Sequence, residues 1–111
     1  MNETESKFVE RFGNTPQVRV IDFLIENRVF DHSKTEIAEG SSVTRKTLDT
    51  FFDNLIKTGM VTNTRKIGRA LLYELNKKNT VVQKLLEIDK ALNLEIADEI
   101  ANDTACDKAT A

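Results

Sequence analysis

Three positively charged side chains stand together at a predicted chain reversal, where Arg65, Lys66 and Arg69 surround Gly68. Cations at the tip of a hairpin can pair with phosphate oxygens, and arginine also enters narrow minor grooves. This pattern predicts contact with the backbone or minor groove of double-stranded DNA. The same charges would discourage aggregation at a sheet edge, so a purely structural explanation stays open.

A second polar group opens a helix predicted from Thr44 to Thr58. When Leu48 is set inward, Lys46 and Thr50 point away from the core and Thr47 lies at the edge of that face. The first turn of a helix in the major groove can read base edges, because Arg and Lys favour guanine and the Thr methyl group can touch that of thymine. We therefore predict DNA contacts from Arg45, Lys46, Thr47 and Thr50, and a phosphate contact from Thr44 that a capping role explains equally well.

Two carboxylates, Asp49 and Asp53, lie on the same outward face and would repel phosphates. They could accept from cytosine, pair with cations at helical spacing, or mark that only the helix tip enters the groove. They also leave open that this face binds another protein. Hydroxyl groups and charge near helix starts add the predicted phosphate contacts Lys34, Thr35 and Ser42, each of which a cap or surface role explains equally well.

Local signals place the helices that must hold these groups. Thr15 and Pro16 suit the start of a helix that ends near Asn27. Ser33 and Glu36 have the spacing of a capping box, which opens a short helix over 34–39. The apolar residues of the 44–58 helix recur at helical spacing, and a glycine follows in position to end it.

The remaining elements are read from alternation and turn residues. An extended segment over 29–32 precedes the short helix, strands over 60–64 and 70–75 flank a turn over 66–69, and a long helix begins near 80 and runs to about 101. Two helices joined by a tight turn and followed at once by a hairpin predict a winged helix-turn-helix. The predicted class is therefore α+β, mainly α, with a β-hairpin wing and a long C-terminal helix.

These elements give a domain organisation for the chain. We predict a flexible N-terminus (1–7), a winged helix DNA-binding domain (8–79), a C-terminal dimerisation helix (80–101) and a disordered tail (102–111). The apolar stripe of the long helix is wide for so small a core, so it is expected to pack against a second copy of the chain. Its residues are Val81, Val82, Leu85, Leu86, Ile88, Leu92 and Ile96.

Four stretches of the sequence resemble a family of archaeal winged helix-turn-helix transcription regulators. They are Phe12–Pro16, Asp31–Ala38, Val43–Leu48 and Thr64–Asn76, within a resemblance over residues 8–94. The resemblance implies a cytoplasmic DNA-binding regulator, often dimeric and related in shape to the MarR and ArsR groups. It assigns Arg45, Lys46 and Thr47 to the start of the recognition helix and Arg65, Lys66 and Arg69 to the wing tip, while the tail has no counterpart.

Composition and charge limit the classes of function. The 111 residues suit one domain, and 40% hydrophobic with 31% charged residues is typical of a globular chain. No apolar run has the length of a membrane helix, the polar N-terminus is unlike a signal peptide, and a single cysteine fits a reducing cytoplasm. The net charge is −2, but residues 32–86 carry +5 between acidic flanks of −2 and −5.

Residues for catalysis or metal binding are sparse. His32 and Cys106 are the single members of their types, and no nucleophile–base pair, phosphate-cradling glycine loop or paired carboxylates in a cleft is evident. We predict no enzyme activity, no metal site, no cofactor and no membrane partner. The predicted function is a sequence-specific, DNA-binding transcription regulator that acts as a homodimer. A winged-helix protein-interaction module is the alternative, followed by a regulator whose unknown small-molecule effector binds between the long helix and the core.

Overall fold

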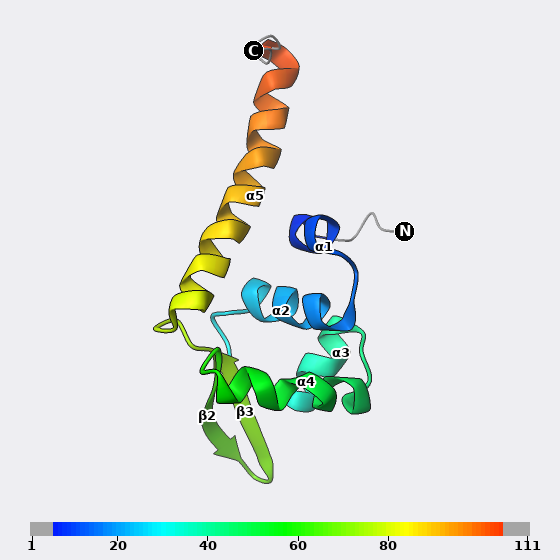
Figure 1. The fold of residues 1–111 in the computed structure, drawn as a ribbon, viewed down its shortest axis with the longest axis vertical. Helices are drawn as coiled ribbons and strands as arrows, with labels where there is room; N and C mark the ends of the chain where they lie inside the picture. Colours follow the sequence, from blue (N-terminus) through cyan, green and yellow to red (C-terminus); the bar gives the residue numbers. More distant parts are fainter. Residues whose placement is uncertain (1–5, 106–111) are drawn as a thin grey trace.

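A β-hairpin and a long helix extend in opposite directions from a cluster of short helices (Figure 1). The computed structural model describes the backbone of residues 6–105 and the side chains of residues 6–95. The elements are α1 (Lys7–Phe12), α2 (Pro16–Glu26), β1 (His32–Ser33), α3 (Lys34–Ser41), α4 (Arg45–Lys57), β2 (Val61–Ile67), β3 (Ala70–Leu75) and α5 (Thr80–Ala105). This mainly helical order with a hairpin wing confirms the predicted winged helix.

Hydroxyl side chains begin the central helices where the sequence predicts them. Thr15 Oγ1 accepts from the Val18 amide at 3.2 Å at the start of α2. Ser33 and Glu36 form the complete capping box of α3. Thr44 Oγ1 accepts from the Thr47 amide at 3.0 Å and caps α4. Each cap satisfies an amide that would otherwise lack a partner, so the direction of each helix is fixed at its first turn.

The hydrophobic core lies where α2, α3 and α4 meet the inner face of the sheet. Phe52 of α4 is fully buried, and its ring makes a T-shaped contact with Tyr73 of β3 at 5.1 Å between centroids. Such edge-to-face pairs add to the stabilisation from burial alone. The buried cluster is Phe8, Val20, Leu24, Ile25, Ile37, Ala38, Leu48, Phe52, Leu55, Val61, Tyr73, Leu75, Val82 and Leu92.

The three strands form an antiparallel sheet in the order β1-β3-β2. The prediction that the first hairpin strand ends at 64 was wrong, because β2 continues through Ile67 and the turn is confined to Gly68 and Arg69. Pairing with β3 continues to Ile67 opposite Ala70, so cross-strand hydrogen bonds hold residues that the sequence alone marks as polar loop. Arg65 and Lys66 therefore lie along a strand, and Arg69 lies at the turn.

Two short segments differ from the sequence prediction. The extended segment predicted at 29–32 is observed at His32–Ser33, because only these residues pair with β3. The short helix predicted over 34–39 is longer as α3, which continues to Ser41 and is followed by the left-handed cap residue Ser42. Gly40 lies within α3, and a Cβ there would come within 2.1 Å of the Phe23 ring of α2, so a larger residue at this position would require the ring to move.

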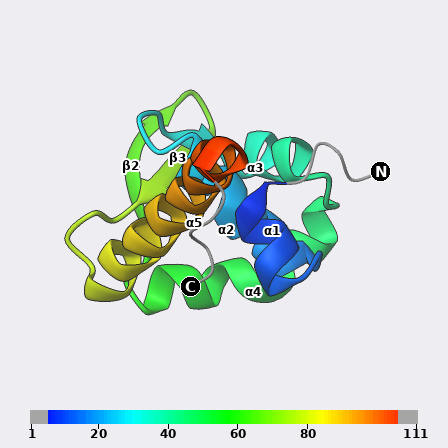
Figure 2. The ribbon, with the colours of Figure 1, turned by 90° about the horizontal axis from the view of Figure 1, so that it is seen from above.

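Helix α5 begins against the core and then extends beyond α1 (Figures 1 and 2). Val82 and Leu92 of the predicted dimerisation stripe are buried within the chain, and Leu85 and Leu86 pack partly against the core. These side chains therefore pack within the protomer, whereas Val81 and Ile88 are exposed and the side chain of Ile96 lies outside the described residues. The helix continues past the predicted end at 101 as far as Ala105, the last residue that the structure describes, and no glycine or proline interrupts it.

The first and last helices differ in extent from the predicted flexible N-terminus and disordered tail. Residues 102–105 of the predicted tail are helical, and residues 106–111 lie outside the described residues. At the other end, the prediction of a flexible segment over 1–7 was wrong for Ser6, which caps α1, and for Lys7, which is its first residue, while residues 1–5 lie outside the described residues. Within the described residues, no helix has the length and apolar character needed to span a membrane.

Two isoleucines provide a test of the core. Ile37 is fully buried on α3, whereas Ile67 on β2 is 55% exposed. We expect Ile37→Ala to lower the free energy of unfolding by about 2–5 kcal/mol, because it removes buried methyl groups and leaves a cavity. Ile67→Ala should cost less than about 1 kcal/mol. Urea denaturation measures both, and equal losses would contradict this placement of the core.

Candidate nucleic-acid interface

Three cationic side chains from different parts of the chain line one cavity. Lys34 lies at the start of α3, Arg45 at the start of α4 and Arg69 at the hairpin turn, around a space of about 330 Å³. We call this cavity the basic pocket; its other lining residues are Ser33, Thr35, Ala70, Leu71 and Tyr73. The amide end of α3 lies at its edge, and helix N-termini favour anions. The charges and hydroxyl groups of this lining are suited to an oxyanion such as a phosphate group.

Neighbouring side chains hold two of these cations in place. Arg45 Nη1 donates to Thr35 Oγ1 at 3.0 Å, so the first turns of α4 and α3 are joined by a side-chain hydrogen bond. Lys34 Nζ lies 3.4 Å from the Asp49 carboxylate and 5.5 Å from the centroid of the Phe52 ring. Asp49 therefore pairs with a cation on the adjacent helix, a partner that spacing along α4 does not reveal.

The outward face of α4 carries the other residues predicted to read DNA. Thr44, Lys46 and Thr50 are exposed, and Thr47 is half-buried. Thr44 donates to Thr47 Oγ1 at 3.0 Å, and Thr50 donates to the Thr47 carbonyl at 2.6 Å. Among residues 6–95, no carboxylate forms an ion pair with Arg45, Lys46, Lys66 or Arg69.

Arg65 has a different environment from the other predicted contacts. Its Nε donates to Asp31 Oδ2 at 2.9 Å and its Nη2 to Asp31 Oδ1 at 3.1 Å. The hydrogen bonds from Arg65 and Thr64 hold the pKa of Asp31 at about 2, below its usual 3.8. The predicted site thus includes an arginine that is already paired, and sequence reasoning missed Asp31 because its partners are more than thirty residues away.

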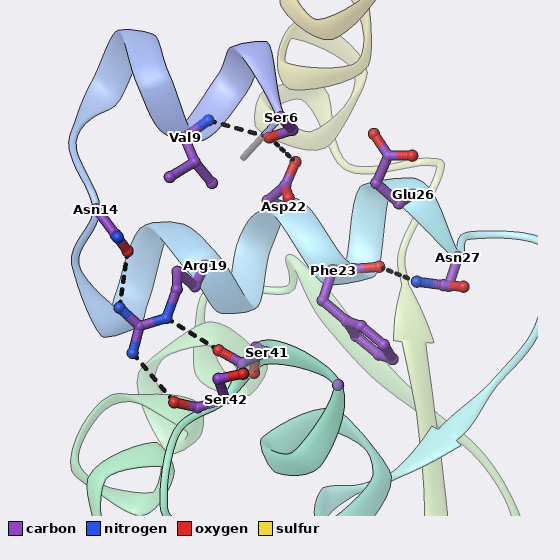
Figure 3. A pocket seen from close by; sticks show the side chains of 11 residues that line it. Ser6, Val9, Asn14, Arg19, Asp22, Phe23, Glu26, Asn27, Ser41 and Ser42 are labelled. Atoms are coloured by element: carbon purple, nitrogen blue, oxygen red, sulfur yellow. Dashed lines mark hydrogen bonds between the residues drawn. The ribbon is translucent and has the colours of Figure 1, made fainter. Parts of the chain in front are cut away.

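Ser42 is also set apart from the basic pocket. It lines a separate cavity of about 590 Å³ between α1, α2 and the end of α3 (Figure 3). Arg19 crosses this cavity and donates to the carbonyls of Ser41 at 2.9 Å and Ser42 at 3.2 Å, and to Asn14 at 2.8 Å. Arg19 therefore fixes the turn that precedes α4, a role that its sequence context does not signal.

Three carboxylates from two helices meet beside this cavity. Oxygens of Asp22, Glu26 and Asp89 lie within 4.8 Å of one another, which corrects the prediction that no carboxylates are paired. Burial raises the pKa of Asp22 against the opposing hydrogen bond from Ser6, and Asp89 raises it further. Burial likewise raises the pKa of Glu26, with added repulsion from Asp22 and Asp89. Oxygen ligands alone suit hard cations, and the raised pKa values of Asp22 and Glu26 reflect burial together with the mutual repulsion of the three carboxylates.

No protein-family model matches the sequence, and no curated protein matches it. Solved structures do match the fold. A mutant of ZitR from Lactococcus lactis is 17% identical over 77% of this chain, with a TM-score of 0.57. Wild-type ZitR in complex with DNA is 16% identical over 77% of this chain, with a TM-score of 0.55. This chain covers 60% of the length of ZitR in both structures.

A third structural match is Sso10a-2, a DNA-binding protein from Sulfolobus solfataricus. It is 18% identical over 78% of this chain and 92% of its own length, with a TM-score of 0.50. At these identities the likeness establishes the fold alone. The resemblance to archaeal regulators therefore stays a prediction.

The carboxylate cluster predicts a stabilising substitution. Because the folded-state pKa of Asp22 is raised, its charged form destabilises the fold at neutral pH, and this cost fades as pH falls through the folded-state pKa toward 3.8. Asp22→Asn keeps an acceptor for Ser6 and should raise the melting temperature at pH 7 by about 2–4 °C, as expected for ~0.5 kcal/mol after allowing for solvent screening.

Calorimetry across pH 4–7 measures this difference, which should narrow on acidification. Asp53→Asn, an exposed change on α4, is the matched control and should leave the melting temperature unchanged. A lower melting temperature for Asp22→Asn at pH 7 would contradict the account of the cluster.

Proposed function

We propose that this protein binds double-stranded DNA as a sequence-specific transcription regulator, with α4 in the major groove and the β2–β3 hairpin against the backbone. The observation that carries the proposal is the basic pocket. Lys34, Arg45 and Arg69 come from three separate elements and line one cavity of about 330 Å³, which has room for a phosphate group. Surface cations without a common function would not be expected to line one cavity from three separate elements.

The chemistry of the pocket favours a backbone phosphate. Arginine forms paired hydrogen bonds with phosphate oxygens, and neither Arg45 nor Arg69 is paired with a carboxylate among the described side chains. The first turn of α3 contributes amide groups and the Thr35 hydroxyl. Contacts of this kind fix the register of the protein on the duplex without reading sequence.

Sequence would be read from the neighbouring face of α4. Lys46 and Thr50 are exposed beside Thr47, and the helix is capped at Thr44, so its first turn is held in one orientation. Lys46 suits guanine, and the threonine methyl groups suit thymine. Lys66 on β2 reaches the adjacent backbone or minor groove. Asp49 lies 3.4 Å from Lys34, which reduces its repulsion of phosphates but also offsets part of the charge that Lys34 brings to the basic pocket.

The fold adds support from outside the chain. ZitR, which shares it, has a structure in complex with DNA, and Sso10a-2 is described as a DNA-binding protein. The cations and hydroxyl groups of the basic pocket and of α4 suit binding of DNA, which is what a transcription regulator requires. The rival function, a protein-interaction module on the same fold, predicts that the native protein binds no duplex DNA at low salt.

A second copy of the chain is the proposed partner of α5. The helix of 26 residues is about 39 Å long and extends past α1. Val81 and Ile88 are exposed seven residues apart, on one face beside the buried part of the stripe. A homodimer would present two α4 helices to half-sites about one helical turn apart.

Removal of the pocket cations tests DNA binding. We expect Lys34→Ala, Arg45→Ala and Arg69→Ala together to weaken binding to mixed-sequence duplex DNA at least tenfold. The salt dependence of the binding constant should become shallower by about 0.9 for each phosphate that the variant no longer neutralises. Fluorescence anisotropy at several salt concentrations measures both quantities.

The matched control removes the same charge elsewhere, through Lys77→Ala, Lys84→Ala and Lys90→Ala at exposed positions. It should retain most of the affinity and the full salt dependence. Equal weakening in both variants would mean that net charge alone acts. If the native protein binds no duplex at low salt, the DNA-binding proposal fails and the protein-interaction function takes its place.

The proposed dimer has its own test. Sedimentation equilibrium should give twice the protomer mass of 12.6 kDa. Val81→Asp with Ile88→Asp should give the protomer mass, because buried carboxylates without partners oppose association. Leu94→Asp, on the opposite side of α5 and also exposed, is the control and should remain dimeric. Protomer mass for the native chain at micromolar concentration would contradict the proposal.

A further inference from the structure

One carboxylate joins the hairpin to the segment before β1. Asp31 accepts two hydrogen bonds from the Arg65 guanidinium, at 2.9 and 3.1 Å, and one from the Thr64 hydroxyl at 2.5 Å. Its side chain is only 14% exposed, whereas that of Arg65 is 60% exposed. Because Asp31 adjoins β1 and its partners belong to β2, these bonds tie the two outer strands of the sheet across β3.

A bulge in β2 makes this arrangement possible. Consecutive side chains of a regular strand point to opposite faces, so Thr64 and Arg65 could not both reach one carboxylate. The register with β3 shifts between Asn63 and Arg65, which leaves Thr64 as the additional residue. The Asn63 side chain donates to the Leu72 carbonyl at 2.8 Å and to the Arg65 carbonyl at 3.3 Å, so the bulge has its own supporting hydrogen bonds.

The bulge lies between the body of the domain and the turn that carries Arg69. Bulges bend a strand and increase its twist, so the direction of the hairpin beyond this point depends on how the bulge is held. Arg69 contributes to the basic pocket only while the hairpin keeps its present angle to α3 and α4. Among the described side chains, the Asp31 contacts link residues 64 and 65 to the segment before β1, and the Thr64 hydroxyl also lies 3.3 Å from the Leu72 carbonyl of β3.

We propose that Asp31 is a positioning residue for DNA binding, which holds the hairpin so that Arg69 faces the basic pocket, and that Arg65 serves this brace and not the DNA. The inference rests on the proposed function and assigns Arg65 a different role from the wing cations Lys66 and Arg69. It predicts that removal of this carboxylate lowers the affinity for DNA. Removal of a negative charge near a DNA-binding face should tighten binding by electrostatics alone, whereas loss of a brace should weaken it.

The experiment compares Asp31→Asn, Arg65→Gln and the double variant with the native chain in duplex-DNA anisotropy at several salt concentrations. The brace predicts that each single change weakens binding at least about threefold and that the double variant is no weaker than the worse single variant, since both remove one interaction. It also predicts an unchanged salt slope for Arg65→Gln. Tighter binding by Asp31→Asn, or a slope shallower by about 0.9 for Arg65→Gln, would overturn it.

Amide hydrogen exchange without DNA separates the brace from the proposed function. Asp31→Asn should accelerate exchange in residues 64–72 and leave α2 unchanged, whether or not the protein binds DNA. If the native chain binds no DNA, the proposed function fails, and with it the role of Asp31 in binding. Unchanged exchange at 64–72 would overturn the brace itself. Lys66→Gln, at a neighbouring position without this contact, is the control and should leave exchange unchanged while lowering the salt slope.

Discussion

The positions of the three cations of the basic pocket depend on the burial of one aromatic ring. Phe52 is fully buried on α4, meets Tyr73 of β3 edge to face, and lies beneath the Lys34 ammonium at the start of α3. Of the elements that supply the basic pocket, α4 carries this ring, and both α3 and the β3 strand of the hairpin contact it. Because protein interiors are close-packed, a shift of any one of these elements would disturb the other two. The geometry of the cations follows from the core beneath them.

Charge is distributed along the molecule in a way that fits this geometry. The cations of α3, α4 and the hairpin gather at one end, while the carboxylates of Asp22, Glu26 and Asp89 meet between α2 and α5, away from the hairpin. An anionic ligand would be attracted to the first end and repelled from the second. The acidic net charge of the whole chain therefore does not by itself oppose DNA binding, although Asp31 and Asp49 also lie at the cationic end, each paired with a cation.

Local signals let the sequence predict the helices and the residues that begin them. The caps at Thr15, Ser33 and Thr44 and the apolar stripe of α4 depend only on neighbours within a few residues, and each was confirmed. Features that depend on distant partners were missed. The length and bulge of β2 follow from pairing with β3, and the contacts of Asp31 and the carboxylate cluster join segments far apart in the sequence. The convergence of Lys34, Arg45 and Arg69 likewise required the fold.

The central claim is that the face formed by the start of α3, the start of α4 and the hairpin turn binds duplex DNA. Amide hydrogen exchange of the native chain, with and without a mixed-sequence duplex at low salt, tests it most directly. The account predicts that DNA slows exchange around residues 34–36, 45–50 and 65–70, with little change along α5. Protection confined to α5 or to the cavity crossed by Arg19, or no protection with bound duplex, would contradict the account.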